Sequence, residues 1–494
     1  MSIIRFVALK QSIGLADYEP DSHLAPQITR LREAAKEYMA RDHRTIFIVN
    51  STEHGGGVAE MLPSQIGLMR DLGMDVEWVV IEPQEPAFFD LTKRLHNAIH
   101  GGHRPQVTAS ERALYERVSK DAADELAKRV APNDLLIIHD PQPAGMGALI
   151  KEKLGVRAIW RCHIGHDETT PATIDAWDFL RPAVSKYDWA VFSVPEYVPE
   201  FLQDRAVVIP PAIDPLSEKN EELSVHQLVN MLSSAALLVP TQPMLEPPFP
   251  IPAKRLTSDG TFVPAVQVGD PGLISRPVIT QVSRWDRLKG WAPLLDAFVA
   301  LKRHQPHPNP YERRRLELSR LVLAGPDPAA IADDPEGKAV LEELCAKWLA
   351  LPADLQQHIV LLSLPMDSRQ RNAHIVNALQ RCSTIVVQNS LREGFGLTVT
   401  EAMNKACCVV STHAAGIRAQ IEEGVHGRLV RDPNDPEEIA RILRDTLTDP
   451  MQRNLLGRNA CRRVGDHYLT PSQLRLWLRL LSETFGAVRV LEDS

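Results

Sequence analysis

The sequence predicts an α/β protein built from two Rossmann-like, doubly wound domains, and three observations support this class. The chain has 494 residues, more than one hydrophobic core usually organises, so two domains of about 200–250 residues each are expected. In both halves, short apolar runs rich in β-branched residues alternate with helical stretches, which is typical of parallel sheets. Polar and glycine-rich residues directly follow several of these runs, where open α/β sheets bind their ligands.

Composition and charge exclude several classes of protein. Hydrophobic residues make up 44% of the chain and charged residues 24%, as in ordinary soluble globular proteins. The net charge of −8 argues against a nucleic-acid partner, which usually requires a basic face. No run of 18 apolar residues and no signal-peptide core occurs, so we expect a cytoplasmic protein without a membrane partner. The six cysteines lack CxxC spacing, so we expect reduced thiols and no metal ligation by them.

The chain is expected to divide into five segments. Residues 1–43 form an N-terminal extension with no assigned chemistry, and residues 44–215 form the first Rossmann-like domain. Proline-rich sequence over 216–276 predicts an irregular connector. Residues 277–469 form the second Rossmann-like domain. Residues 470–494 form a C-terminal crossing helix and a tail.

The apolar runs predict the strands of both sheets. In the first domain, strands are expected at residues 45–50, 76–81, 135–138, 158–160 and 189–193. In the second domain, strands are expected at residues 278–282, 321–324, 359–362, 383–388, 409–411 and 428–430.

A triple glycine, Gly55, Gly56 and Gly57, follows the first predicted strand and precedes a helix. Amide groups in such a loop can face a pyrophosphate or a sugar without interference from side chains. The spacing is neither that of the GxGxxG fingerprint nor that of a P-loop, and a plain tight turn is the alternative. Asp140 and His163 follow later strands of the same sheet, so one shared crevice is favoured.

Two acids mark the loop after the strand at 383–388. Glu393 precedes Gly394, Phe395 and Gly396, and Glu401 follows with seven residues between the two acids. A carboxylate is a natural partner for the paired hydroxyls of a sugar or a ribose, because both of its oxygens accept hydrogen bonds. The alternative is that Glu401 is an ordinary first-turn acid of a helix and Glu393 a solvated loop residue.

Arg284 and Lys289 follow the strand at 278–282, just before a helix. Two cations at the end of a strand lie where a diphosphate could bind. The alternative is that both are solvated surface bases.

Together with the motifs given below, these loops make the chain resemble the family 4 retaining glycosyltransferases of GT-B architecture. Within that family, the chain is most similar to the trehalose glycosyltransferring synthases. The resemblance runs from about residue 44 to residue 486. The motifs that carry it are residues 54–60 (HGGGVAE), 139–143 (HDPQP), 160–164 (WRCHI), 210–220 (PPAIDPLSEKN), 283–286 (SRWD) and 392–403 (REGFGLTVTEAM). It implies two Rossmann-like domains facing a central cleft, with the acceptor on the first domain and the nucleotide sugar on the second.

The resemblance also implies roles for individual residues. The implied catalytic residues are His163, Arg284, Lys289 and Glu393. The implied donor-binding residues are Gly55, Gly56, Gly57, Arg284, Lys289, Glu393, Gly394, Phe395, Gly396, Leu397 and Glu401. The implied acceptor-binding residues are Asp140, Gln142 and His163.

The implied reaction joins glucose from a nucleoside-diphosphate glucose to a second glucose, giving α,α-trehalose with retention. The alternatives are a retaining trehalose phosphorylase that uses glucose 1-phosphate, a family 4 transferase with another acceptor, and a non-enzymatic nucleotide-sugar-binding regulator. No permanently bound cofactor is expected, no motif requires a metal, and Mg²⁺ and a homodimer are left open. The sequence departs from the related synthases at Gly165, where these commonly have an acid, so the choice of acceptor stays open.

Overall fold

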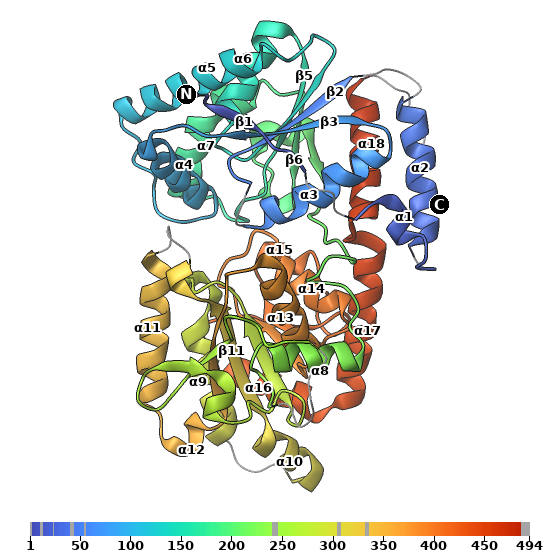
Figure 1. The fold of residues 1–494 in the computed structure, drawn as a ribbon. Coiled ribbons are helices and arrows are strands. Elements are labelled where there is room, and N and C mark those ends of the chain that lie inside the picture. Colours follow the sequence, from blue (N-terminus) through green and yellow to red (C-terminus); the bar gives the residue numbers. More distant parts are fainter. Residues whose placement is uncertain are drawn as a thin grey trace. The chain divides into compact units, whose positions relative to one another are not determined.

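The computed structural model describes residues 2–9, 13–22, 24–39, 44–53, 56–239, 246–303, 308–330 and 335–485. The chain forms two compact units, the first made of Met1–Asp214 with His467–Ser494 and the second of Pro215–Asp466. Each unit contains one mainly parallel sheet covered by helices (Figure 1). The α/β class and the two doubly wound domains are therefore confirmed.

The sheet of the first unit has seven strands in the order β1-β3-β2-β4-β5-β6-β7. The strands are β1 (Ile4–Phe6), β2 (Thr45–Asn50), β3 (Asp75–Ile81), β4 (Leu135–His139), β5 (Arg157–Arg161), β6 (Trp189–Phe192) and β7 (Ala206–Val208). From β2 the chain proceeds to β3 on one side and then returns to β4 on the other. The switch point, where ligands of such sheets bind, therefore lies between β2 and β4.

Two groups of helices cover this sheet. The helices are α1 (Leu15–Tyr18), α2 (Ala25–Met39), α3 (Gly56–Asp71), α4 (Pro86–Ile99), α5 (Ala109–Leu126), α6 (Ala144–Leu154), α7 (Pro171–Val184) and α18 (Thr470–Thr484). Helices α4 to α7 pack against one another, and α18 packs against α2 and α3 (Figure 1). The reversal of strand order at the switch point assigns these groups to opposite faces of the sheet.

The N-terminal segment belongs to this sheet. Residues Ile4–Phe6, predicted as part of an extension, pair antiparallel with β3 and form an edge strand. The hydroxyl of Tyr18 in α1 donates to Asp214 at 2.9 Å, and the hydroxyl of Ser64 in α3 donates to the same carboxylate at 2.8 Å. The start and the end of residues 1–214 are thus joined through one buried acid.

The sheet of the second unit has eight strands in the order β15-β14-β13-β10-β11-β12-β8-β9. The strands are β8 (Lys254–Leu256), β9 (Phe262–Pro264), β10 (Val278–Val282), β11 (Arg320–Pro326), β12 (Ile359–Leu364), β13 (Ile385–Gln388), β14 (Val409–Thr412) and β15 (Arg428–Val430). The six strands from β10 to β15 are parallel to one another, and the switch point lies between β10 and β13.

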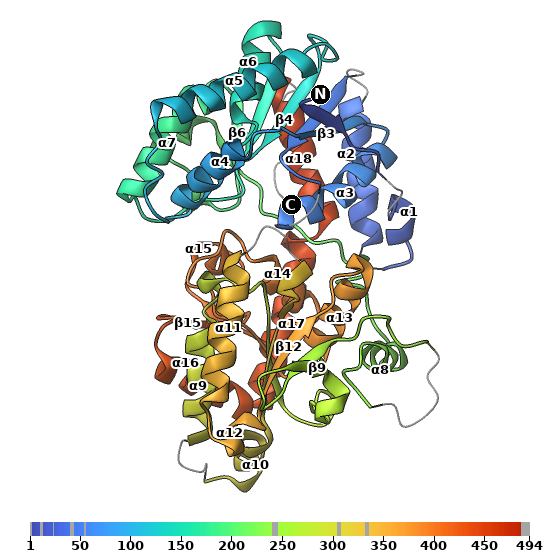
Figure 2. The same cartoon turned by 60° about the vertical axis from the view of Figure 1, so that its left-hand side comes forward.

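Part of the predicted irregular connector is regular structure. Strand β8 pairs antiparallel with β12, and β9 pairs antiparallel with β8, so residues 254–264 extend the second sheet (Figure 2). The helix expected inside the connector is α8 (Val225–Ser234), which packs against α13 (Arg369–Arg381).

The remaining helices of the second unit cover both faces of its sheet. They are α9 (Trp291–Arg303), α10 (Pro310–Leu318), α11 (Pro335–Leu349), α12 (Ala353–Gln356), α14 (Leu397–Asn404), α15 (Ala415–Arg418), α16 (Pro436–Thr448) and α17 (Pro450–His467). Helices α9 and α16 pack against each other over a core that includes Trp291, Phe298 and Leu443. Among the described helices, none combines the length and the apolar character that crossing a membrane requires.

Candidate functional site

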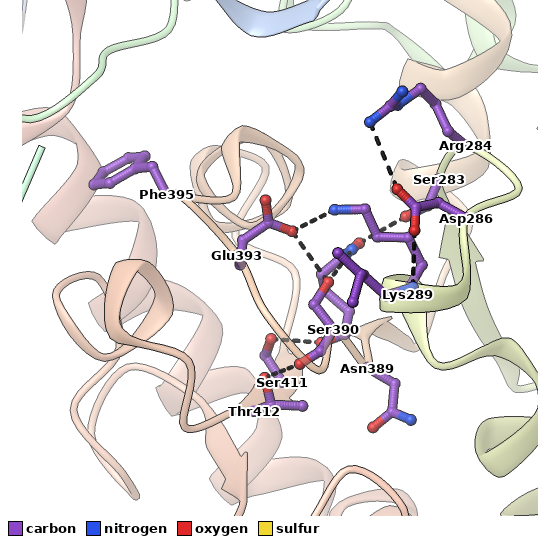
Figure 3. Close-up of polar contacts among 12 residues, drawn as sticks. Ser283, Arg284, Asp286, Lys289, Asn389, Ser390, Glu393, Phe395, Ser411 and Thr412 are labelled. Carbon is purple, nitrogen blue, oxygen red and sulfur yellow. Dashed lines mark hydrogen bonds and ion pairs between the residues drawn. The ribbon is translucent and has the colours of Figure 1, made fainter. Parts of the chain in front are cut away.

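The loops after β10 and β13 meet at the switch point of the second unit. Residues 283–289 follow β10, and residues 389–393 follow β13, its parallel neighbour. The ammonium of Lys289 donates to Glu393 Oε2 at 2.6 Å, and the two side chains are only 16% and 15% exposed. The alternative that Lys289 and Glu393 are solvated surface residues is therefore wrong. Figure 3 shows this pair at the centre of a group of polar side chains.

A chain of uncharged polar side chains supports Glu393. Ser390 Oγ donates to Glu393 Oε2 at 3.0 Å, and Gln388 Nε2 donates to Ser390 Oγ at 2.8 Å. Ser283 Oγ, at the end of β10, donates to Gln388 Oε1 at 2.9 Å. Thr412 Oγ1 donates to the carbonyl of Ser390 at 2.6 Å, so β14 also holds this loop (Figure 3). These bonds fix the carboxylate in a defined position before any ligand arrives.

The loop that carries Lys289 is fastened to the same strands. Gln281 Nε2 donates to the carbonyl of Lys289 at 2.8 Å, and the amide of Asn389 donates to Gln281 Oε1 at 2.9 Å. Gly290 then turns the chain with φ of +60°, and a Cβ there would lie 2.1 Å from the carbonyl oxygen of Asn389. Only glycine fits this position, because a side chain would clash with the β13 loop.

Arg284 lies in a different setting from Lys289. Its side chain is 65% exposed and is 3.7 Å from Asp286 Oδ2, while Asp286 Oδ1 accepts from the amide of Leu288 at 2.8 Å (Figure 3). The two cations predicted after β10 are thus one enclosed ammonium and one exposed guanidinium.

The glycine-bearing loop leads into α14, which begins at Leu397. Gly396 precedes the helix with φ of +89°, a conformation that favours glycine. Phe395 is buried, and its carbonyl accepts a hydrogen bond from Gln420 Nε2. A Cβ at Gly416 would lie 2.5 Å from Phe395 Cα, so α15 packs directly on the backbone of the loop. The first backbone amides of α14 are therefore held in place and can donate hydrogen bonds to an anion or a hydroxyl.

Glu401 is also buried, with 5% exposure, and lies beyond the first turn of α14, so the alternative of an ordinary first-turn acid is wrong. Its Oε1 lies 3.6 Å from the ammonium of Lys219. The ammonium of Lys405, one turn further on, donates to the carbonyl of Glu401 at 3.1 Å and to Asn220 Oδ1 at 3.3 Å. Burial lowers the pKa of Lys405 to about 8.

Lys219 is a residue that the sequence reasoning did not assign to the site. Asn377 Nδ2 of α13 donates to the carbonyls of Glu218 and Glu221 at 3.1 and 2.9 Å, and Arg381 donates to the carbonyl of Glu221 at 2.8 Å. This fastening holds Lys219 beside Glu401. The sequence signal for Lys219 is the block PLSEKN at residues 215–220, which is part of one of the motifs that carry the family resemblance.

In the first unit, the last residue of β4 and the loop after β5 bring two histidines together. His139 Nδ1 and His163 Nε2 are 2.9 Å apart, and the rings are stacked with centroids 5.2 Å apart. Burial lowers the pKa of His139 to about 3 and that of His163 well below its usual value, and the nearby Arg161 adds to both effects. One neutral ring therefore donates to the other.

Asp140 and Arg161 complete this polar cluster. The amide of His163 donates to Asp140 Oδ1 at 2.9 Å, and Asp140 has φ of +65°. Burial raises the pKa of Asp140 to about 6, against the lowering effect of that hydrogen bond and of Arg161. Arg161 is 1% exposed, and among the described residues neither Nη1 nor Nη2 has a hydrogen-bond partner; His139 Nε2 has none either. The sequence reasoning quoted Arg161 in a motif but gave it no role.

The other predicted residues of the first unit have simpler surroundings. Gly56 and Gly57 are the first residues of α3, whereas Gly55 lies outside the described residues. Gln142 is half-buried, and its Oε1 has no hydrogen-bond partner within the described parts of the chain. At Gly165 a Cβ would lie 2.1 Å from Cγ of Tyr197, so the tyrosine ring excludes a side chain there.

Two family models match the chain. The model for the N-terminal domain of trehalose synthase matches residues 48–199, and the model for glycosyl transferases group 1 matches residues 273–463. A solved UDP-forming α,α-trehalose-phosphate synthase of Burkholderia xenovorans aligns with a TM-score of 0.62 at 16% identity, covering 89% of this chain and all of that one. The fold and the second family model define the chain as a glycosyltransferase of GT-B architecture.

The sequence relatives narrow this class. A trehalose synthase of Thermococcus litoralis is 35% identical over 435 residues, which cover 88% of this chain and 89% of that protein. A trehalose phosphorylase of Pleurotus pulmonarius is 26% identical over 87% of this chain and 56% of its own length. The chain belongs to the trehalose synthase family.

Proposed function

We propose that this glycosyltransferase moves glucose from a nucleoside-diphosphate glucose to the anomeric hydroxyl of a second glucose and releases α,α-trehalose and the nucleoside diphosphate. The bond between the anomeric carbon and the diphosphate oxygen breaks, and the bond to the acceptor oxygen forms on the same face of the sugar. The acceptor proton passes to an oxygen of the departing diphosphate. Atoms and charge balance without a covalent enzyme intermediate, so no pair of carboxylates flanking the bond is required.

The observation that carries this proposal is the enclosed pair of Lys289 and Glu393 at the switch point of the second sheet. A departing diphosphate develops negative charge, and a fixed ammonium in a partly dry site stabilises that charge better than water does. The carboxylate of Glu393 is suited to the hydroxyls of the transferred glucose. Arg284, Gly394, Phe395, Gly396 and Leu397 are proposed to complete the donor site.

Glu401 is proposed to hold the ribose hydroxyls of the donor. Its carboxylate is buried beside the ammonium of Lys219, and both oxygens of a carboxylate can accept hydrogen bonds from paired hydroxyls. Because Glu401 makes this ion pair apart from the pair of Lys289 and Glu393, the two acids can hold two different sugars.

The proposed acceptor residues are His163, Asp140 and Gln142 in the first unit, with Gly55, Gly56 and Gly57 meeting the diphosphate or the reacting sugar. A neutral His163 can accept from or donate to a sugar hydroxyl, but burial keeps its pKa low, so the ring is not protonated at neutral pH and cannot serve as the general acid. We therefore assign the proton to the donor phosphate and assign His163 to positioning the sugar. No permanently bound cofactor is part of the proposal, Mg²⁺ is only an assay variable, and the proposed location is the cytoplasm.

The test is incubation of the purified protein with UDP-, ADP- or GDP-glucose and glucose, with and without Mg²⁺. We expect a non-reducing disaccharide with two α linkages by NMR and one nucleoside diphosphate released for each disaccharide formed. Lys289→Met should remove this activity, whereas Lys338→Met on the exposed face of α11 is the matched control and should keep it. Release of no nucleotide from any activated glucose would refute the proposal.

A second candidate is a trehalose phosphorylase, which the match to the Pleurotus enzyme favours. It predicts that glucose 1-phosphate and glucose give trehalose and inorganic phosphate without any nucleotide. A transferase with another acceptor predicts that a sugar phosphate replaces glucose in the same assay. A nucleotide-sugar-binding regulator predicts ligand binding without turnover in every arm.

A further inference from the structure

The second unit has a pocket of about 230 Å³ at the amino ends of its central strands. Its lining includes Ser275, Arg276, Thr384, Arg315 and Arg453. Strands β10 and β13 start at this pocket, and the loops with Lys289 and Glu393 follow the other ends of the same strands. The pocket is therefore about one strand length, roughly 17 Å, from the candidate donor site.

Some cations near this pocket already have partners. In a doubly wound fold, helices end where parallel strands begin, so their last carbonyls attract cations. Arg453 donates to the carbonyls of Thr446 and Leu447 at the end of α16, both at 3.2 Å. Lys302 donates to the carbonyl of Leu316 at the end of α10 at 2.8 Å. Closing a helix end is a sufficient role for these two residues.

In the part of the chain that the structure describes, Arg276 and Arg315 do not bond to the carbonyls of a helix end, so that role does not explain their position. Within the described residues, neither guanidinium makes a hydrogen bond or an ion pair, although both are half-buried in the pocket wall. Each faces another cation instead. Burial and then Arg276 lower the pKa of Arg320, and burial and then Arg315 lower the pKa of Arg453.

The neighbouring acids compensate only part of this charge. Asp270 counteracts the shift at Arg320, and Asp449 counteracts the shift at Arg453. The side chain of Asp270 also accepts from the amide of Gly272 at 2.7 Å. Four guanidinium groups therefore converge with two carboxylates near them, in a protein whose net charge is −8.

We propose that this pocket binds the phosphoryl group of a small phosphorylated compound, held by Arg276 and Arg315. Guanidinium groups bind phosphate oxygens with two parallel hydrogen bonds, and Ser275 and Thr384 add hydroxyls to the wall. At about 30 Å³ for each water molecule, the pocket holds several waters, which is more room than a phosphoryl group alone fills. A hexose phosphate therefore suits the space, and inorganic phosphate shares its chemistry.

The test is calorimetric titration with inorganic phosphate and with glucose 6-phosphate at constant ionic strength. All proteins carry Lys289→Met, so that phosphate binding at the candidate donor site is weakened equally in all of them. We expect Arg276→Ala/Arg315→Ala to weaken binding about tenfold or more, because two charged bidentate contacts are lost. Arg314→Ala is the matched control on α10, since within the described parts of the chain its exposed guanidinium pairs with Glu317 alone.

Each outcome decides the proposal. Tighter binding of glucose 6-phosphate than of inorganic phosphate, lost in the double variant, supports a sugar-phosphate site. Equal binding of both compounds, lost in the double variant, supports a site for the phosphoryl group alone. Binding that is the same in the double variant and in the Arg314→Ala control overturns the proposal, as does the absence of any binding. Circular dichroism and the melting temperature verify that the double variant is folded. None of these results depends on the transferase reaction, so failure here leaves the proposed function untouched.

Discussion

Acid should destabilise the first unit through His139, and His139→Gln isolates this effect. Burial lowers the pKa of His139 to about 3, whereas an unfolded chain keeps the ordinary value near 6.5. Between these values the unfolded state binds more protons than the folded state, so stability falls as the pH falls. At about 1.4 kcal/mol for each pKa unit, acidification from pH 6.5 to pH 4 costs roughly 3 kcal/mol at this residue.

The neighbouring Asp140 should show the opposite sign. Its pKa is raised to about 6 in the folded state from 3.8, so the folded state binds more protons between these values. The buried charge of Asp140 therefore destabilises the folded state by roughly 3 kcal/mol above pH 6, and this destabilisation disappears below pH 4. Asp140→Asn keeps an oxygen that accepts from the amide of His163, so it should raise stability at pH 7 and leave it nearly unchanged at pH 4.

The assay is urea-induced unfolding at pH 7, 5.5 and 4, with the exposed His226→Gln as the matched control. Between pH 6.5 and pH 4, we expect the free energy of unfolding of His139→Gln to fall by about 3 kcal/mol less than that of the original chain. His163 titrates in the same direction as His139 and remains in every protein, so it does not affect the difference. Parallel loss of stability in the original chain and in His139→Gln would refute the reasoning. So would the same sign of effect for His139→Gln and Asp140→Asn.

Three further predictions concern catalysis. Lys289→Met should lower kcat with the nucleotide sugar about 100-fold or more, because a fixed cation no longer meets the leaving group; an unchanged rate in a steady-state assay would contradict its assignment. Lys219→Met should raise KM for the nucleotide sugar about tenfold with a smaller change in kcat, because Glu401 loses the cation at 3.6 Å, and Lys219→Arg should restore much of the affinity. Gly165→Ala should displace the ring of Tyr197 and raise KM for the acceptor more than KM for the donor; equal effects on both would indicate a general loss of structure.

The strands of both parallel sheets were predictable, because long apolar β-branched runs have few alternatives. Strands β2, β10 and β15 were predicted at their observed bounds, and the other predicted parallel strands begin and end within two residues of their observed bounds. Strands β1, β7, β8 and β9 were missed. Each has three residues and lies at or near a sheet edge, so its sequence carries too short a pattern to distinguish it from a loop.

The candidate site was predictable in its position but not in its contacts. Both switch points carry the expected residues, since the alternation of strands and helices determines where strand ends gather. The ion pair of Lys289 and Glu393 joins residues 104 positions apart, and no local pattern encodes such a contact. The burial of Arg161 was not predictable either, because an arginine at the end of a strand is usually exposed.

The different settings of Arg284 and Lys289 have a consequence for how the proposed donor site would bind a diphosphate. Lys289 is already matched by Glu393, and the side chains that hold this pair, Gln388 and Ser390, are uncharged. In the proposed reaction, a diphosphate would therefore enter a site where Lys289 and Glu393 already balance each other, so further positive charge would have to come from a group that moves. Arg284 is 65% exposed, and its ion pair with Asp286 is a long one of 3.7 Å. Exposed ion pairs contribute little to stability, so moving this side chain costs little free energy. We therefore assign Arg284 to capturing the incoming diphosphate and Lys289, held in place by its loop, to stabilising the departing one.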